Sequence, residues 1–166
     1  MAQRRNRNPI AALLFLAYVA LMVYLLFIRN RTSAEGLTYW EQIRRNCSFV
    51  PWHTVGNYWD VLTRPDYYIQ KWEPAAYNRQ VTIALVNIFG NIAMFVPFGT
   101  FLPAMWPRLQ KVWKAVPVGF LIILLVEILQ LFTLRGRCDV DDVLLNMIGI
   151  LSGYGLWRLT HRKNKN

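Results

Sequence analysis

Four long segments almost free of charged residues constrain this chain more than any other feature. Three of them contain no Asp, Glu, Lys or Arg, and the third in chain order contains only one such residue, Glu127. A helix needs roughly 20 mostly apolar residues to cross the hydrocarbon core of a bilayer. The last segment is the shortest, and Arg158 extends it by reaching back to the membrane interface. We therefore expect four membrane-spanning helices, at about residues 9–28, 81–103, 115–134 and 143–160.

These segments predict an all-α protein: a four-transmembrane-helix bundle in one domain over residues 1–166. A large external loop, about residues 29–80, joins the first two spans. Its aromatic residues are Tyr39, Trp40, Phe49, Trp52, Tyr58, Trp59, Tyr67, Tyr68, Trp72 and Tyr77. One interpretation is an interfacial belt, in which the rings rest at the level of the lipid head groups. The other is a lid over an outward-facing site, with rings that pack against a sugar or acyl ligand.

The charge distribution indicates a membrane orientation rather than a nucleic-acid-binding surface. The formal net charge is +10, but the basic residues flank the uncharged segments and do not gather on one exposed face. Ten basic and no acidic residues lie in the N-terminus, the second connection and the C-terminal tail, against nine basic and eight acidic ones on the other side. Because basic residues accumulate on the cytoplasmic side, we expect a multi-pass protein of the cell membrane with both termini cytoplasmic. Its expected partner is the lipid bilayer, and not nucleic acid.

Polar residues inside the second and third spans recur on single helix faces. Asn87 and Asn91 lie four residues apart, and Glu127 and Gln130 lie three residues apart, so each pair shares one face. An amide or carboxylate facing lipid without a partner costs several kcal/mol. We therefore expect these faces to meet inside the bundle.

The fourth span carries a stripe that continues this pattern: Asp142, Asn146, Gly149 and Gly153. Its two glycines form a small-xxx-small pair, which lets another helix approach closely. Counting about 1.5 Å per residue places Asn87, Glu127, Gln130 and Asn146 ~4–11 Å below the external ends of their spans. We infer one polar cavity that opens outward. Its expected ligand-binding residues are Asn87, Asn91, Glu127, Gln130, Arg137 and Asn146, and the catalytic candidates, if a reaction occurs, are Glu127, Asp139 and Asp142.

Several of these residues also have simpler interpretations. The asparagine pair fits interhelical hydrogen bonding, Glu127 fits an ion pair with Arg137, and the acidic run from Asp139 to Asp142 fits a helix N-terminal cap. A divalent ion held by Asp139, Asp142 and Glu127 is disfavoured because the loop lacks the spacing of a calcium-binding loop. We expect no metal and no cofactor.

Two cysteines, Cys47 and Cys138, are predicted on the external side. Disulfides persist in such an oxidising place, so a bond between the long loop and the exit of the third span is allowed. The histidines, His53 and His161, fall on opposite sides of the membrane and cannot share a zinc ion.

Three ordered motifs in these spans resemble the VanZ-like family. Residues 87–99 read NIFGNIAMFVPFG, residues 127–130 read EILQ, and residues 137–149 read RCDVDDVLLNMIG. They are similar to the family blocks N-x-x-G-N-x-x-x-F-x-P-F-G, E-x-x-Q and R-x-x-D-V-D-D-x-x-x-N-x-x-G, with one residue fewer after the arginine. Residues 44–52, RRNCSFVPW, resemble a further family segment that has Phe where this chain has Trp52.

The resemblance implies a bacterial membrane protein connected with resistance to teicoplanin, a lipid-bearing glycopeptide that acts on cell-wall precursors. It carries over the positions of Asn87, Asn91, Glu127, Gln130, Arg137, Asp139, Asp142 and Asn146, but no mechanism. The leading hypothesis is a protein that binds or excludes an amphiphilic ligand at the outer leaflet. The alternatives are an intramembrane enzyme acting on a lipid-linked cell-wall precursor, with Glu127 as general base, and a proton-coupled transporter. The sequence predicts no oligomeric state.

Overall fold

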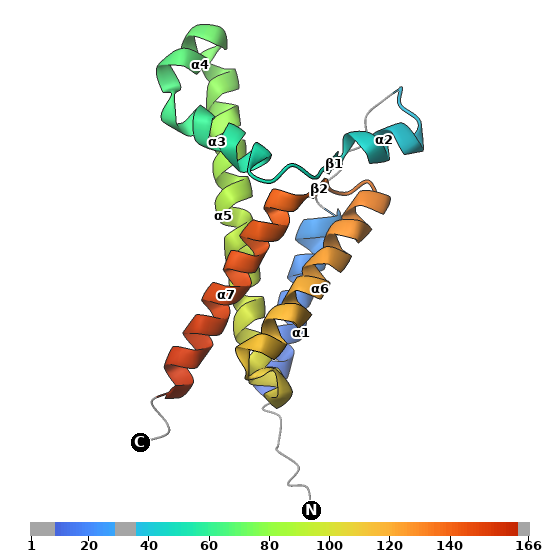
Figure 1. The fold of residues 1–166 in the computed structure, drawn as a ribbon, viewed down its shortest axis with the longest axis vertical. Coiled ribbons are helices and arrows are strands. Elements are labelled where there is room, and N and C mark those ends of the chain that lie inside the picture. Colours follow the sequence, from blue (N-terminus) through green and yellow to red (C-terminus); the bar gives the residue numbers. More distant parts are fainter. Residues whose placement is uncertain (1–8, 29–35, 163–166) are drawn as a thin grey trace, which may run out of the picture.

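The protein is nearly all helical in the computed structural model, which describes residues 9–28 and 36–162 (Figure 1). The elements follow in this order: α1 Pro9–Val23, the π-helical turn η1 Tyr24–Ile28, α2 Tyr39–Arg45, β1 Cys47–Ser48, α3 His53–Thr63, α4 Pro65–Lys71, α5 Pro74–Met105, the 3₁₀ turn η2 Pro107–Leu109, α6 Val112–Phe132, β2 Cys138–Asp139 and α7 Val140–Arg162. The two short strands pair in parallel, with Cys47 opposite Cys138 and Ser48 opposite Asp139.

Three helical segments are long and apolar enough to cross a membrane: Pro9–Ile28, Pro74–Met105 and Val112–Phe132. They match the first three predicted spans. The fourth predicted span lies within α7, which is 23 residues long and begins with Asp141 and Asp142 in its first turn. It is not among the candidate spans of the described residues, so a membrane crossing by α7 stays a prediction.

The second span is longer than expected because α5 starts at Pro74 and not at residue 81. Proline is favoured in the first turn of a helix, where its missing N–H costs nothing. At about 1.5 Å per residue, this helix of 32 residues exceeds the ~30 Å hydrocarbon core. Figure 1 shows α5 continuing past the other long helices towards α3 and α4.

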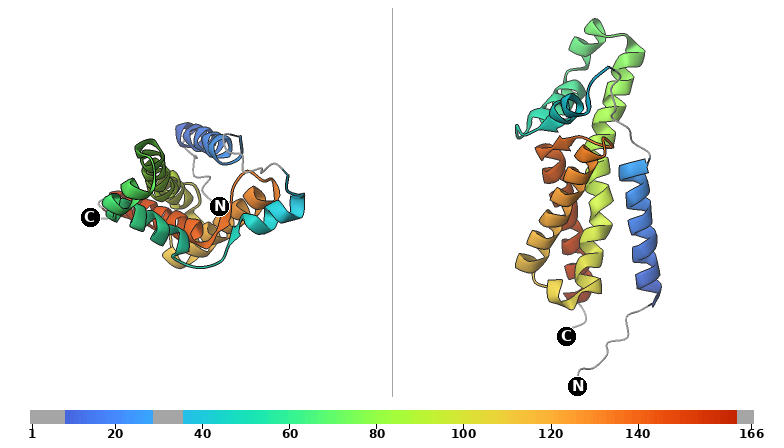
Figure 2. Two further views of the ribbon diagram at one scale, coloured as in Figure 1. Left: turned by 90° about the horizontal axis from the view of Figure 1, so that it is seen from above. Right: turned by 90° about the vertical axis from the view of Figure 1, so that its right-hand side faces the viewer.

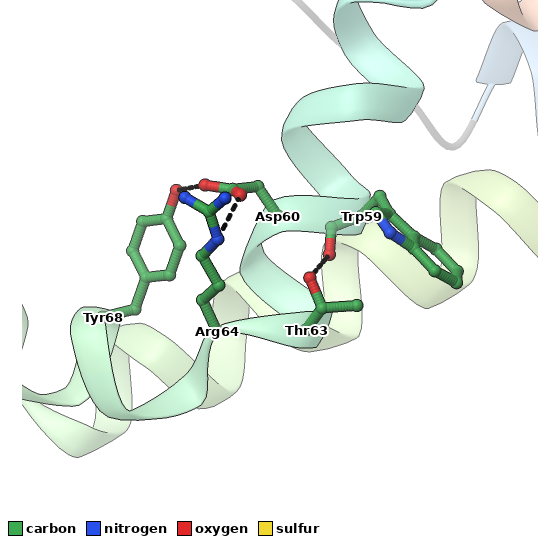
Figure 3. Close-up of polar contacts among 5 residues, drawn as sticks. All are labelled: Trp59, Asp60, Thr63, Arg64 and Tyr68. Carbon is green, nitrogen blue, oxygen red and sulfur yellow. Dashed lines mark hydrogen bonds and ion pairs between the residues drawn. The ribbon is translucent and has the colours of Figure 1, made fainter.

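The segment expected as a loop is mostly helical where the structure describes it. Thr38 begins α2 with a capping box, in which the backbone N–H of Thr38 donates to Glu41 Oε2 at 2.8 Å. Residues 53–71 form α3 and α4. Figure 3 shows the turn between these two helices, where Arg64 pairs with Asp60 at 3.1 Å and the Tyr68 hydroxyl donates to the same carboxylate at 2.9 Å. Residues 29–35 of the predicted loop lie outside the described part.

The core of the bundle lies between α5, α6 and α7, where Phe95, Ile123 and Ile150 are almost fully buried. The closest approach is between α5 and α7. A Cβ atom on Gly153 would collide with the carbonyl oxygen of Val96, and one on Gly149 would collide with that of Ile92. The small-xxx-small pair of the sequence therefore does bring two helix backbones together.

Helix α1 stands at the side of this bundle, as the right-hand view of Figure 2 shows. The Tyr18 hydroxyl donates to the carbonyl of Met94 at 2.6 Å, and the Phe15 ring makes edge contacts with Phe101 and Trp106. The start of α1, the end of α7 and the turn between α5 and α6 lie at one end of the molecule (Figures 1 and 2). The two strands lie at the other end of the bundle.

Candidate functional site

A cavity of about 820 Å³ opens between α1, α5, α6, α7 and the loop that follows α6. All six residues predicted to bind a ligand line it: Asn87, Asn91, Glu127, Gln130, Arg137 and Asn146. Asp142, one of the catalytic candidates, also lines it. The polar faces predicted on three separate helices therefore do meet in one place.

Two side-chain hydrogen bonds cross between helices inside the cavity. Asn91 Nδ2 donates to Asp142 Oδ1 at 2.7 Å, and Asn146 Nδ2 donates to Glu127 Oε1 at 3.4 Å. Asn87 instead donates to the carbonyl of Ile83 in its own helix at 2.8 Å. Asn91 therefore links two helices, as the interhelical interpretation expects, while Asn87 stabilises only α5.

Two buried oxygen atoms of this group have no hydrogen-bond partner among the described residues: Glu127 Oε2 and Asn146 Oδ1. Both side chains are 3% exposed. A buried polar atom without a partner costs about 1–3 kcal/mol, and in native proteins such an atom is usually satisfied by water or a ligand. Because both atoms are hydrogen-bond acceptors, they fit a ligand or water that donates hydrogen bonds.

Two arginines from the loop after α6 stand at the cavity, Arg135 and Arg137. Leu134, with φ 52°, turns the chain out of the helix, and the N–H groups of Arg135 and Gly136 then donate to the carbonyl of Gln130. Among the described residues, a salt bridge joins Arg64 to Asp60, and none involves Arg135 or Arg137. The expected pair between Glu127 and Arg137 is not formed, so the guanidinium is not neutralised by that carboxylate.

Asp139 and Asp141 do not line the cavity and instead anchor α3. The Asp141 carboxylate accepts hydrogen bonds from the backbone N–H groups of Trp52, Thr54 and Val55 at 2.6, 2.8 and 3.0 Å. Asp139 accepts from the Thr54 hydroxyl at 2.5 Å. Trp52, the N-cap residue of α3, has no side-chain capping bond of its own. The acidic run is thus a cap, as one interpretation expected, but Asp141 caps α3 and not its own helix.

No group of three His, Cys, Asp or Glu side chains in residues 9–28 and 36–162 is arranged to hold an ion.

We expect Asp141→Ala to detach α3 from the start of α7, because three N–H groups lose their acceptor in a partly buried place. The loss should be roughly 2–4 kcal/mol of local stability. Hydrogen exchange of the amides of residues 52–55 measures it, and Asp66→Ala, at an exposed aspartate of α4, is the matched control. Unchanged protection of these amides in Asp141→Ala would contradict this role.

The aromatic segment does not cover the cavity as a lid. No described residue between 36 and 80 is among those that line it. Trp40, Phe49, Trp52 and Trp59 are each more than 60% exposed, and an interfacial belt stays a prediction. One aromatic residue of this segment is affected by a group of the site. Burial, and then the Asp142 carboxylate, raise the pKa of Tyr58 above the usual value.

The sequence interpretation assigned no role to α1, yet this helix supplies one wall of the cavity. Its lining residues are Tyr18, Leu21, Met22, Leu25 and Leu26. Gln130 Nε2 donates to the carbonyl of Leu26 in the π-helical turn at 3.2 Å, which ties α1 to α6. An apolar residue in an apolar span gives no sign in the sequence that it faces a cavity. The polar hydroxyl of Tyr18 is the one feature that sets the cavity-lining residues of this helix apart.

Together, the fold and the cavity define a helical membrane protein with a partly polar site inside its bundle. The family model described as VanZ/LLP1 matches residues 15–161, and the chain belongs to this family. The resemblance carried by the three motifs is thereby confirmed over nearly the whole chain. No protein of curated function and no solved structure shows a significant match to it.

Proposed function

We propose that this protein binds an amphiphilic ligand of the cell envelope in the cavity between α1, α5, α6 and α7. The observation that carries the proposal is the pair of buried acceptors without partners, Glu127 Oε2 and Asn146 Oδ1, beside an apolar wall. The polar group of the ligand donates hydrogen bonds to these two atoms. Its anionic groups, where it has them, meet Arg135 and Arg137.

The apolar part of the ligand lies against the side chains of α1 and α5. Leu21, Met22 and Leu25 line the cavity from one side, and Val86 and Met94 line it from the other. A cavity of about 820 Å³ is within the ~300–1,000 Å³ range of small-molecule sites. It holds a head group and part of an acyl chain, and the rest of such a chain extends into the bilayer.

The orientation that we propose places this cavity in the outer leaflet. The turn between α5 and α6 carries Arg108, Lys111 and Lys114 and lies at the end of the molecule where α1 begins and α7 ends (Figure 1). The cavity is lined by the end of α6 and the start of α7, at the opposite end of these helices. Basic residues favour the cytoplasmic side. In this proposal α7 is the fourth span, both termini are cytoplasmic and the ligand arrives from outside the cell. Resemblance to VanZ-like proteins connects such a ligand with lipoglycopeptides such as teicoplanin or with the lipid-linked precursor on which they act.

Filling the cavity tests the proposal. Ala93 lines it, so the indole of Ala93→Trp would occupy the space of the ligand. With the full chain in lipid nanodiscs, we expect teicoplanin or lipid-linked cell-wall precursor to bind the unchanged protein, and Ala93→Trp to weaken that binding at least tenfold. Resistance of a bacterial host to teicoplanin should fall in parallel.

Ala20→Trp is the matched control for this experiment. Ala20 is exposed on α1 and does not line the cavity, so the same substitution there should leave binding unchanged. Binding of neither probe, or equal binding by Ala93→Trp and the unchanged protein at equal folded amounts, would contradict the proposal.

A second candidate function is an intramembrane enzyme acting on the same class of lipid-linked precursor. It is favoured by one observation: Glu127, with one unpartnered oxygen, and Asp142 line the same cavity. A buried carboxylate with a free oxygen atom is placed to take a proton from a bound hydroxyl group. Turnover of the precursor by the purified protein would establish this function in place of binding alone.

A further inference from the structure

The two cysteines of the chain face each other across the only strand pair of the described residues. Cys47 of β1 is in register with Cys138 of β2, and the N–H of Cys138 donates to the carbonyl of Asn46 at 2.8 Å. Both residues are half-buried thiols. They belong to segments 91 positions apart in the sequence, so only the tertiary structure brings them together.

The geometry of the pair suits a covalent bond. Paired strands lie about 4.7–4.9 Å apart, and residues directly opposite each other project to the same face. Disulfides join residues whose Cα atoms are about 4.4–6.8 Å apart. Because each strand has only two residues, their side chains adjust without disturbing a larger sheet.

We propose that Cys47 and Cys138 form a disulfide that fastens the segment between α2 and α3 to the start of α7. The two thiols give up two protons and two electrons to a disulfide donor outside the cell. One cysteine thiolate attacks a sulfur of the donor and releases one donor thiol. The second cysteine thiolate then displaces the other donor thiol from the mixed disulfide, so that the protein gains one S–S bond and the donor leaves as two thiols.

The disulfide would join the same two parts of the chain that Asp139 and Asp141 hold together, the start of α3 and the start of α7. Cys138 precedes Asp139 directly, and Cys47 lies a few residues before Trp52, whose N–H is bound by Asp141. A closed loop of this length constrains the unfolded chain strongly. The disulfide thus keeps α3 attached to the start of α7 when single hydrogen bonds open.

In the reduced protein, the rate at which the Cys138 thiol is alkylated should depend on pH in a characteristic way. Burial, followed by the nearby Glu127 carboxylate, raises the pKa of the Cys138 thiol to about 11. The thiolate is the reactive form, so a raised pKa leaves little of it at neutral pH. Alkylation of Cys138 should be slow at pH 7 and should accelerate about tenfold for each pH unit up to about 11.

The test uses the full chain in nanodiscs, reduced completely and then exposed to oxidised glutathione as the disulfide donor. We expect both thiols to become unreactive towards a polyethylene-glycol maleimide together, with no dimer on a non-reducing gel. The midpoint of thermal unfolding should rise by roughly 5–15 °C and fall again on reduction.

The matched control moves one thiol by a single position. In the double variant Cys47→Ser/Ser48→Cys, the thiol is opposite Asp139 and points to the other face of the ladder, so closure should be at least tenfold slower. Two reactive thiols after oxidation, a disulfide-linked dimer, or equal closure by the shifted variant would each overturn the proposal. In the cell the bond rests on the proposed orientation, but this chemical test does not, and it needs no ligand. Its failure would therefore leave the proposed function standing.

Discussion

Gly153→Ala should destabilise the protein by roughly 2–4 kcal/mol, because the added methyl group would occupy the space of a neighbouring backbone. The new Cβ atom would overlap the carbonyl oxygen of Val96 and crowd the N–H of Thr100. Backbone atoms within a helix cannot turn aside as a flexible side chain does, so α5 and α7 must separate. The hydrogen bond from the Thr100 hydroxyl to the carbonyl of Gly153, 3.1 Å long, would then be lost as well.

The same helix provides a control of opposite sign. Gly155 lies two residues further on, and a Cβ atom there would meet nothing within 4 Å. Because alanine is a better helix former than glycine, Gly155→Ala should be neutral or should stabilise by up to about 1 kcal/mol. Denaturation midpoints of the two variants in one detergent give the comparison. Equal midpoints would show that the approach of α5 to α7 is not as close as described.

Glu127→Gln should weaken binding of the proposed amphiphilic ligand by about 10–100-fold while leaving the fold intact. Glutamine keeps an acceptor for Asn146 Nδ2, which donates to Glu127 Oε1 in the structure. Its amide nitrogen takes the place of Oε2, the atom that has no partner, and can only donate hydrogen bonds where Oε2 accepts them. A ligand donor that is left without its acceptor in a buried place costs about 1–3 kcal/mol, which corresponds to about this range of affinity. Titration of teicoplanin or of the lipid-linked precursor into nanodiscs measures the change.

Glu41→Gln is the comparison for this variant, because Glu41 is exposed and stabilises only the start of α2. It should bind the ligand as the unchanged protein does. If Glu127→Gln binds normally but fails to turn over the precursor, the carboxylate acts in a reaction and the enzyme hypothesis replaces simple binding. If it both binds and behaves normally in every assay, Glu127 has no functional role in the cavity.

The polar residues show what pattern alone can predict. Asn91, Glu127 and Asn146 stand out in the sequence because each is costly in an apolar helix, and that cost implies that they meet. The structure brings them together. The pattern could not tell Asp142, which joins this group, from Asp139 and Asp141, which bind α3 through the Thr54 hydroxyl and through backbone N–H groups. All three are acidic residues of one short run, and only the direction of each side chain in the fold separates them.

The residue pattern of the long external segment does not reveal its helices. A stretch rich in aromatic and polar residues with Pro65 and Pro74 was expected to be a loop, yet both prolines begin helices. Short helices such as α3 and α4 are stabilised mainly by what they pack against and not by propensity, so a single-sequence pattern signals them weakly.

Taken alone, the amino-acid sequence determined three apolar helices, the polar faces of α5, α6 and α7, and the glycine stripe of α7, because hydrophobic length and residue spacing are local properties of the chain. Tertiary structure alone decided that α1 walls the cavity, that Asp141 caps a helix from another segment, and that Cys47 meets Cys138. Each of these depends on contacts between residues distant in sequence, and such contacts form only when all the helices pack together.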